Sequence, residues 1–175
     1  MTAVSLYTNA PALSNDMAEV LRLFLGNVDL RVNAPGGAMT LTHAEAEIDG
    51  VRVVSVTDGE RRCETREAIT GDAVVDKRLR RRQAKLGVYQ VLKERLGVAP
   101  PWGSLTGIRP TRLLYANLER GFDMDAACAE LARVFDVSDE KIALLRQIVT
   151  VQQGVSAPAP DETDIYIGIP FCVTR

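Results

Sequence analysis

Residues 39–56, which read MTLTHAEAEIDGVRVVSV, decide the fold of the first part of the chain. Two runs that alternate polar and apolar side chains flank Asp49-Gly50, and an Asp-Gly pair in this setting is a strong β-hairpin signal. A second pair, Asp58-Gly59, leads into residues 61–69, where charged and apolar residues alternate again. The pattern predicts an antiparallel meander that packs one face on the N-terminal helix and leaves the other in water.

The residues that precede this meander predict one more helix and two more short strands. Residues 4–7 and 28–32 have strand character, and between them apolar residues recur at helical spacing over residues 15–25. We expect this helix to begin with N-cap chemistry at residues 14–16 and to end at Gly26. Residues 1–72 are therefore predicted to form an α+β unit with a small antiparallel sheet and one helix.

After residue 72 the character of the sequence becomes helical. A helix that stops near Gly97, before Pro100-Pro101, should be followed by helices over residues 110–118, 123–135 and 138–153. The prediction is thus an α+β unit over residues 1–72, a helical region over residues 73–153, a Pro-containing linker over residues 154–164, and a further strand in residues 165–175.

The composition is that of an ordinary globular protein: 175 residues, 46% hydrophobic, with 21 basic and 23 acidic residues. No apolar run approaches the roughly 20 residues that a membrane span requires. The first residues lack the features of a secretory signal, so we expect a cytoplasmic protein with reduced thiols. The single histidine, His43, and the absence of any Cys-x-x-Cys leave few candidates for catalysis or metal binding.

The densest charge lies between Asp76 and Leu96, where eight basic residues accompany two acidic ones. Such a helix can attract phosphates, nucleic acid or a multiply carboxylated ligand. The simpler interpretation, which we prefer, is a solvated helix face that carries salt bridges, and nucleic acid is the least favoured partner because no aromatic residues interleave with the basic ones. The candidate anion-steering residues are Lys77, Arg78, Arg80, Arg81, Arg82 and Lys85.

The other polar features have plain structural interpretations. His43 lies within a polar alternation, so it is predicted to be a solvated surface side chain. Cys63 and Cys128 are predicted to be small apolar fillers or idle surface thiols. The loop over residues 102–110 combines Trp102 with several structure breakers. It is either a docking loop or a rigid connection in which Trp102 fills the core, and the sequence leaves both interpretations open.

Two segments carry a resemblance to a known family. Residues 101–111, PWGSLTGIRPT, are followed by residues 166–175, YIGIPFCVTR. Together they resemble the oxygen-independent coproporphyrinogen III oxidase family of radical S-adenosylmethionine (SAM) enzymes, and more narrowly its HemZ-type coproporphyrinogen dehydrogenase branch. Residues 165–175 would then begin the (β/α) barrel of the radical SAM core.

The resemblance implies cofactors that this chain holds only in part. In the family, a Cys-x-x-x-Cys-x-x-Cys run binds three irons of a [4Fe-4S] cluster and leaves the fourth iron to SAM. Cys172 matches the first cysteine, and the second would fall one residue past Arg175, so the fragment itself is expected to bind no stable cluster and to catalyse nothing. Tyr166 matches a tyrosine near the cofactor and the substrate, and Phe171 would shield the cluster.

The activity implied for the longer protein is oxidative decarboxylation of propionate side chains to vinyl groups in haem biosynthesis, through a radical derived from SAM. Its partners would be a porphyrinogen substrate, an electron donor and the downstream barrel, with no membrane. The basic helix is then a candidate for steering the four carboxylates of the substrate. Two alternatives remain: a radical SAM relative with another substrate or a haem-handling role, and a noncatalytic anion-binding or RNA-binding module that uses the basic helix.

Overall fold

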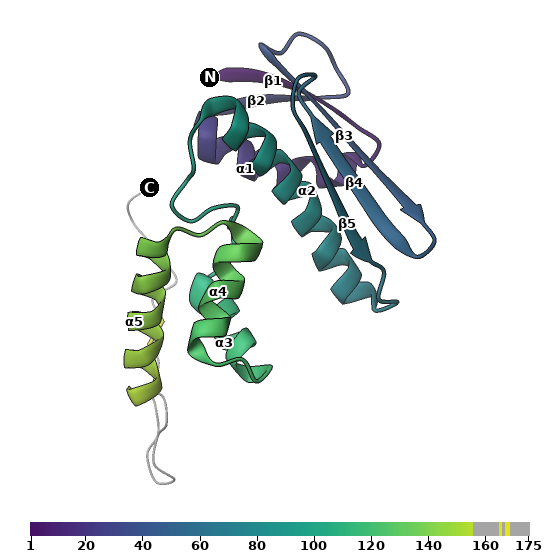
Figure 1. Ribbon diagram of the computed structural model, residues 1–175. Helices are drawn as coiled ribbons and strands as arrows, with labels where there is room; N and C mark the ends of the chain where they lie inside the picture. Colours follow the sequence, from purple (N-terminus) through teal and green to yellow (C-terminus); the bar gives the residue numbers. More distant parts are fainter. Residues whose placement is uncertain (156–164, 166, 169–175) are drawn as a thin grey trace.

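A computed structural model describes residues 1–155, 165, 167 and 168 of the chain, and Figure 1 shows the arrangement of its elements. In chain order the elements are β1 (Thr2–Thr8), the 3₁₀ helix η1 (Pro11–Leu13), α1 (Ser14–Leu25), β2 (Val28–Val32), β3 (Met39–Ile48), β4 (Val51–Thr57), β5 (Arg62–Ala68), α2 (Ala73–Leu96), α3 (Pro110–Glu119), α4 (Met124–Phe135) and α5 (Asp139–Val155). The predicted α+β class is confirmed.

The five strands form one sheet in the order β2-β1-β3-β4-β5. The predicted antiparallel meander is present in β3, β4 and β5, which the turns at Asp49-Gly50 and Asp58-Gly59 connect. Strand β1 differs from the prediction because it lies parallel to both of its neighbours, β2 and β3. The reason is that α1 carries the chain back to the end of the sheet where β1 began, so β2 runs in the same direction as β1.

The short connection from β2 to β3 crosses over β1 on the face away from the helices. Gly37 permits this close approach, since a Cβ atom placed on it would lie 2.3 Å from the backbone nitrogen of Ser5. Its amide N–H donates to Oγ of Ser5 at 2.9 Å, and Ser5 is buried beneath the crossing. A larger residue at position 37 would therefore displace the crossing from the sheet.

Helices α1 and α2 cover one face of the sheet (Figure 1), and their apolar side chains form the first hydrophobic core with the inward residues of β1, β3 and β4. Gly87 allows α2 to approach β4 closely, because a Cβ atom there would lie 2.6 Å from Cγ2 of Val56. The core contains Val4, Leu6, Met17, Val20, Leu21, Leu41, Val56, Val88, Tyr89 and Leu92 among its buried members.

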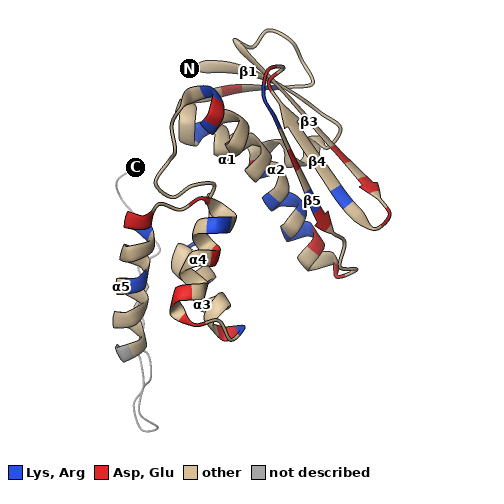
Figure 2. Cartoon of the chain, in the orientation of Figure 1, with Lys and Arg blue, Asp and Glu red and all other residues tan. Residues whose placement is uncertain are grey.

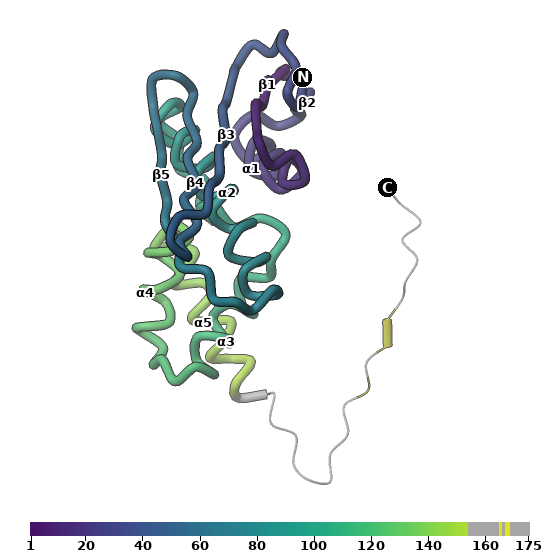
Figure 3. Tube along the Cα trace, turned by 90° about the vertical axis from the view of Figure 1, so that its right-hand side faces the viewer, coloured from purple at the N-terminus to yellow at the C-terminus, as the bar shows by residue number. Residues whose placement is uncertain are grey.

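A second hydrophobic core lies within α3, α4 and α5, beyond the ends of α1 and α2 (Figure 3). Leu114, Leu131, Leu145 and Val149 are its largest buried aliphatic side chains, and Trp102 packs against their cluster. Helix α2 thus packs with the sheet, whereas the three later helices pack with one another. The predicted domain boundaries at residues 72 and 153 stay predictions.

Most helix ends lie where the sequence predicts them. Asp72 and Asp123 accept hydrogen bonds from backbone N–H groups of the first turns of α2 and α4, and Gly97 ends α2 in the left-handed conformation. The expectation for α1 is wrong in its detail. Because η1 leads directly into α1, the N-cap residue is Leu13, which has no side-chain cap, and Asp16 is buried in ion pairs with α2 instead.

The predicted linker and all but three residues of the predicted barrel strand lie outside the described residues. Of these three, Ile165 and Ile167 are exposed. Among the described residues, no helix combines the length and the apolar character needed to cross a membrane.

Candidate functional site

The basic helix α2 is the most highly charged element, and its sequence explains how it is held. Its carboxylate N-cap, Asp72, accepts hydrogen bonds from the N–H groups of Val74 and Val75 at 2.8 and 3.1 Å. The acidic residue of its first turn, Asp76, accepts hydrogen bonds from Thr70 and Gly71. One face of the helix packs on the sheet, and the charged residues flank that face (Figure 2).

Three consecutive arginines of α2 pair with carboxylates of other helices and strands. Nε of Arg80 donates to both carboxylate oxygens of Glu45 on β3, at 3.0 and 2.9 Å, and its Nη2 also contacts Glu45. Nε of Arg81 donates to Asp16 of α1 at 3.0 Å, and Nη2 of Arg82 pairs with Glu67 of β5. The arginines thereby connect α2 to α1 and to two strands.

Lys85 connects three segments at one ammonium group. Its Nζ donates to Glu19 of α1 at 2.7 Å and to Oγ1 of Thr106 at 2.9 Å, and it lies 3.5 Å from Asp16. The hydrogen bond from Lys85 holds the pKa of Glu19 below its ordinary value, against the opposing effect of burial. This contact fixes the loop that follows α2 against α1.

Four of the six candidate steering residues therefore have carboxylate partners within the chain, as the salt-bridge interpretation predicts. The other two, Lys77 and Arg78, are exposed, and the described part of the chain contains no hydrogen-bond or ion-pair partner for either. Steering of a ligand by α2 stays a prediction. Lys77 and Arg78 are the side chains most available for it.

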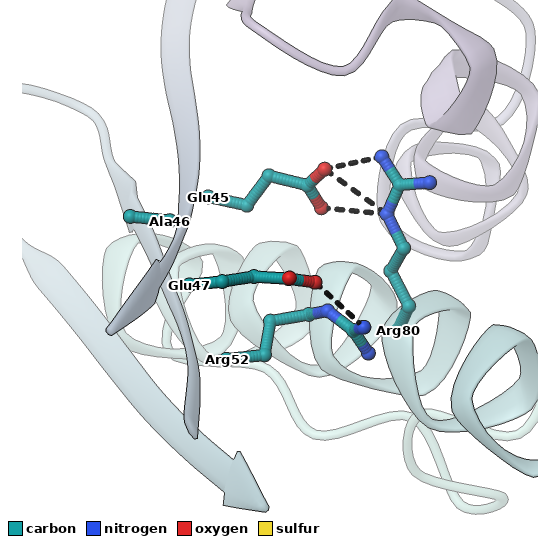
Figure 4. A pocket seen from close by; sticks show the side chains of 5 residues that line it. All are labelled: Glu45, Ala46, Glu47, Arg52 and Arg80. Carbon is teal, nitrogen blue, oxygen red and sulfur yellow. Dashed lines mark hydrogen bonds and ion pairs between the residues drawn. The ribbon is translucent and has the colours of Figure 1, made fainter. Parts of the chain in front are cut away.

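A hollow of about 330 Å³ opens between the N-terminal half of α2 and the distal end of the β3–β4 hairpin (Figure 4). Two ion pairs lie side by side in it, Glu45 with Arg80 and Glu47 with Arg52. Nη1 of Arg52 also donates to the carbonyl oxygen of Asp76 at 3.2 Å, and Arg52 is buried. Sequence reasoning missed this cluster, because Arg52 stands within a run of valines and nothing nearby indicates an inward charge.

His43 contradicts the prediction of a solvated side chain. It is buried on the face of β3 that packs against the helices, and its Nδ1 lies 2.9 Å from Oγ1 of Thr8. Its Nε2 is buried and has no hydrogen-bond partner among the described residues. Burial lowers the pKa of His43, and the positive charge of Arg80 adds to this effect, whereas Glu45 opposes it.

The loop that contains Trp102 is hydrogen-bonded to the loop between α4 and α5. The N–H of Ser104 donates to the carbonyl oxygen of Phe135 at 2.8 Å, and the N–H of Ser138 donates to that of Pro101 at 3.0 Å. A Cβ atom on Gly103 would lie 1.8 Å from the carbonyl oxygen of Phe135, so the two loops are in direct contact. The core-filling interpretation of Trp102 is supported, since this side chain packs against the second core.

The predicted cofactor residues Tyr166, Phe171 and Cys172 lie outside the described residues. The two described thiols, Cys63 and Cys128, have pKa values raised by burial. Cys63 is half-buried and Cys128 is buried, as fillers should be. Within residues 1–155, 165, 167 and 168, no group of three His, Cys, Asp or Glu side chains could hold a metal ion.

No protein-family profile matches this chain. It is 44% identical over 89 residues, which are 49% of the chain, to the oxygen-independent coproporphyrinogen-III oxidase-like protein HemZ of Bacillus subtilis (strain 168). The match covers 18% of that relative, so the chain corresponds to a small part of its length. The predicted resemblance to HemZ-type proteins is thus confirmed over about half of the chain.

Proposed function

We propose that this chain is the N-terminal accessory region of a radical SAM enzyme of the oxygen-independent coproporphyrinogen dehydrogenase type. The longer protein would convert propionate side chains of a porphyrinogen to vinyl groups in haem biosynthesis, in the cytoplasm. The observation that carries this proposal is the 44% identity to a coproporphyrinogen-III oxidase-like protein over 89 residues.

In this proposal Cys172 is the first of three thiolate ligands, and the other two follow Arg175 in the longer protein. The cluster and SAM together would supply the radical chemistry, as cofactors do in enzymes of this kind. Tyr166 and Phe171 would line the cofactor site beside Cys172. Iron–sulfur clusters are held by cysteine thiolates, and this chain would supply one of them, Cys172.

The described residues have a supporting role in this proposal. Their two hydrophobic cores and the ion pairs of α2 form the folded part that precedes, in the sequence, the segment with Cys172. Lys77 and Arg78 would attract the carboxylates of the substrate, because they are exposed and unpaired within the described part of the chain.

The test uses the longer protein, reconstituted with iron and sulfide without oxygen. Cys172→Ala should lose most of the iron, the sulfide and the brown colour, and with them reductive cleavage of SAM. Cys63→Ala and Cys128→Ala are matched controls that should keep the cluster, because the two thiols belong to different cores and burial disfavours the thiolate form of both. A full cluster in the Cys172→Ala protein would refute the ligand assignment.

The substrate is tested separately in the same preparation. Formation of vinyl groups from coproporphyrinogen III supports the dehydrogenase activity. Cleavage of SAM without any change in the porphyrinogen would instead favour a relative that acts on another substrate.

A further inference from the structure

Helix α5 carries an exposed apolar stripe outside the second core. The stripe consists of Leu144, Ile148 and Val151, which follow one another at spacings of four and three residues and so share one face of the helix. Leu144 is 40% exposed and Val151 is 67% exposed, whereas their neighbours Leu145 and Val149 are buried in the second core. A helix that packs only against α3 and α4 should carry polar side chains on this outer face.

The outer face of the same helix is also poor in charge. From residue 142 to residue 155 the sequence contains one charged residue, Arg146, which pairs with Asp125 of α4. The second half of α5 therefore has no charged side chain, in contrast with α2 (Figure 2). An exposed apolar centre from which charged residues are depleted is typical of a surface that another part of a protein covers. The exposed residues that flank the stripe are Ala143, Gln147 and Thr150.

The stripe lies within reach of the segment with which the proposed catalytic part begins. Helix α5 has 17 residues and is therefore about 25 Å long. Residues 156–164 separate it from Ile165, and a chain of this length spans at most roughly 35 Å when it is fully extended. Ile165 and Ile167 are 84% and 83% exposed, so the chain presents apolar side chains on both sides of these nine residues.

There are two candidate occupants of the stripe, a second copy of the chain and the part of the longer protein that follows Arg175. The match to HemZ covers 18% of that relative, so most of the relative lies outside the match. A domain on the same chain meets the stripe at a high effective concentration, whereas a second copy must be recruited from solution. Both considerations favour the part that follows Arg175.

We propose that Leu144, Ile148 and Val151 form the docking surface for the domain that follows Arg175 in the longer protein. This inference rests on the proposed function, because it requires that domain. Docking removes three apolar side chains from water, which is the driving force for such a contact. The contact involves neither the cluster nor SAM, so it can be measured apart from the enzymatic activity.

The test compares the labelling of introduced cysteines by a maleimide in the longer protein and in the 175-residue chain. Val151→Cys should react about tenfold more slowly in the longer protein, which corresponds to a docked state about ten times as populated as the undocked state. Val74→Cys is the matched control, because Val74 is 79% exposed on α2, and it should react equally fast in both proteins. Peptide mass spectrometry distinguishes these sites from the native thiols.

Two outcomes of the labelling would overturn the proposal. One is equal labelling of Val151→Cys in the two proteins. The other is protection that is already present in the 175-residue chain and increases with its concentration, which would assign the stripe to a second copy.

A charge placed on the stripe gives a second test. Leu144→Lys, added to the longer Val151→Cys protein, should restore fast labelling, because docking would bury an unpaired ammonium group. The same substitution should leave the urea midpoint of the 175-residue chain unchanged, since this ammonium group can stay in water. Leu23→Lys on α1 is the matched control, because Leu23 is 43% exposed, and it should keep the protection. Protection that survives Leu144→Lys would overturn the proposal.

The iron content of the same longer protein, measured after reconstitution, separates this inference from the proposed function. A protein that holds a cluster but does not protect position 151 contradicts the docking alone. A protein that protects position 151 but holds no cluster contradicts the enzymatic proposal alone.

Discussion

Asp136, at the end of α4, contacts two side chains of α2, Tyr89 and Lys93. We expect the contact with Tyr89 to contribute more to stability than the contact with Lys93. Oη of Tyr89 donates to Oδ2 of Asp136 at 2.6 Å, and Nζ of Lys93 lies 2.6 Å from the same oxygen. Tyr89 is fully buried, whereas Lys93 and Asp136 are each 36% exposed. The two donors on α2 therefore contact one carboxylate at the end of α4 from environments of different polarity.

The environments set the expected magnitudes. Tyr89→Phe should lower the free energy of unfolding by about 1.5–3 kcal/mol, because it removes a buried hydrogen bond to a charged group. Lys93→Met should cost only about 0.2–1 kcal/mol, since an ion pair that is partly in water contributes little. Asp136 has a φ of 59°, so Asp136→Asn tests the charge while it keeps a residue that tolerates the left-handed conformation.

The assay is urea unfolding at neutral pH, followed by circular dichroism and by the fluorescence of Trp102. Both signals should report the same loss in each variant if Asp136 couples the two cores. A loss for Tyr89→Phe no larger than that for Lys93→Met would refute the argument from burial. A change seen only by the fluorescence of Trp102, which packs against the second core, would refute the coupling of the two cores by Asp136.

The pH dependence of the same contact has a defined sign. Burial would raise the pKa of Asp136, but the hydrogen bonds from Lys93 and Tyr89 outweigh it and hold that pKa below its ordinary value. A carboxyl group with a lowered pKa stabilises the fold above the pKa of the unfolded chain, about 3.9, and this contribution is lost as the pH falls below it. Tyr89→Phe should reduce this acid sensitivity.

Two further predictions follow from single side chains. Because burial lowers the pKa of His43, the unfolded chain binds a proton at this residue more readily than the folded chain does. The stabilising contribution should be complete above about pH 6.5 and decline as the pH falls below that value. In His43→Gln the urea midpoint should therefore depend less on pH between about pH 7 and pH 5, and an unchanged pH dependence would contradict the burial of this ring. Replacing Lys77 and Arg78 by Gln in the longer protein should lower kcat/KM for the porphyrinogen more at low salt than at high salt. Arg133→Gln is the control, because Arg133 pairs with Glu130 on the same helix. A loss of kcat/KM that does not depend on salt would indicate an effect on folding rather than on steering.

The local features of the fold could be predicted from the sequence because each depends on residues close together in the chain. The two Asp-Gly pairs form hairpin turns, and Gly26 and Gly97 end helices, since these positions need positive φ values. The inward position of His43 could also be predicted from the alternation of residues along β3. It has the same parity as Met39 and Leu41 on one strand, and both of those residues are buried. Thr40 and Thr42 lie between these residues and make the stretch resemble a polar one, so the burial of His43 was not predicted.

The remaining features depend on contacts between distant segments. The parallel pairing of β1 follows from the path of α1, which no local pattern specifies. The partners of the basic residues also come from elsewhere, since Arg80 and Glu45 are separated by 35 positions and Arg81 and Asp16 by 65. The sequence indicated how much charge α2 carries. It did not indicate that Arg52 would be buried and paired with Glu47.

The two described thiols, Cys63 and Cys128, are poorly suited to bind the proposed cluster. Cluster ligands are thiolates, and burial raises the pKa values of Cys63 and Cys128, which disfavours the thiolate form. They also belong to different cores, Cys63 beside the first and Cys128 within the second, and cannot converge on one cluster without unfolding one of them. The proposed function instead places the cluster on Cys172 and on two further cysteines of the longer protein. The described residues would then serve the reaction by positioning that segment, and substitutions at Cys63 or Cys128 should change stability rather than iron content.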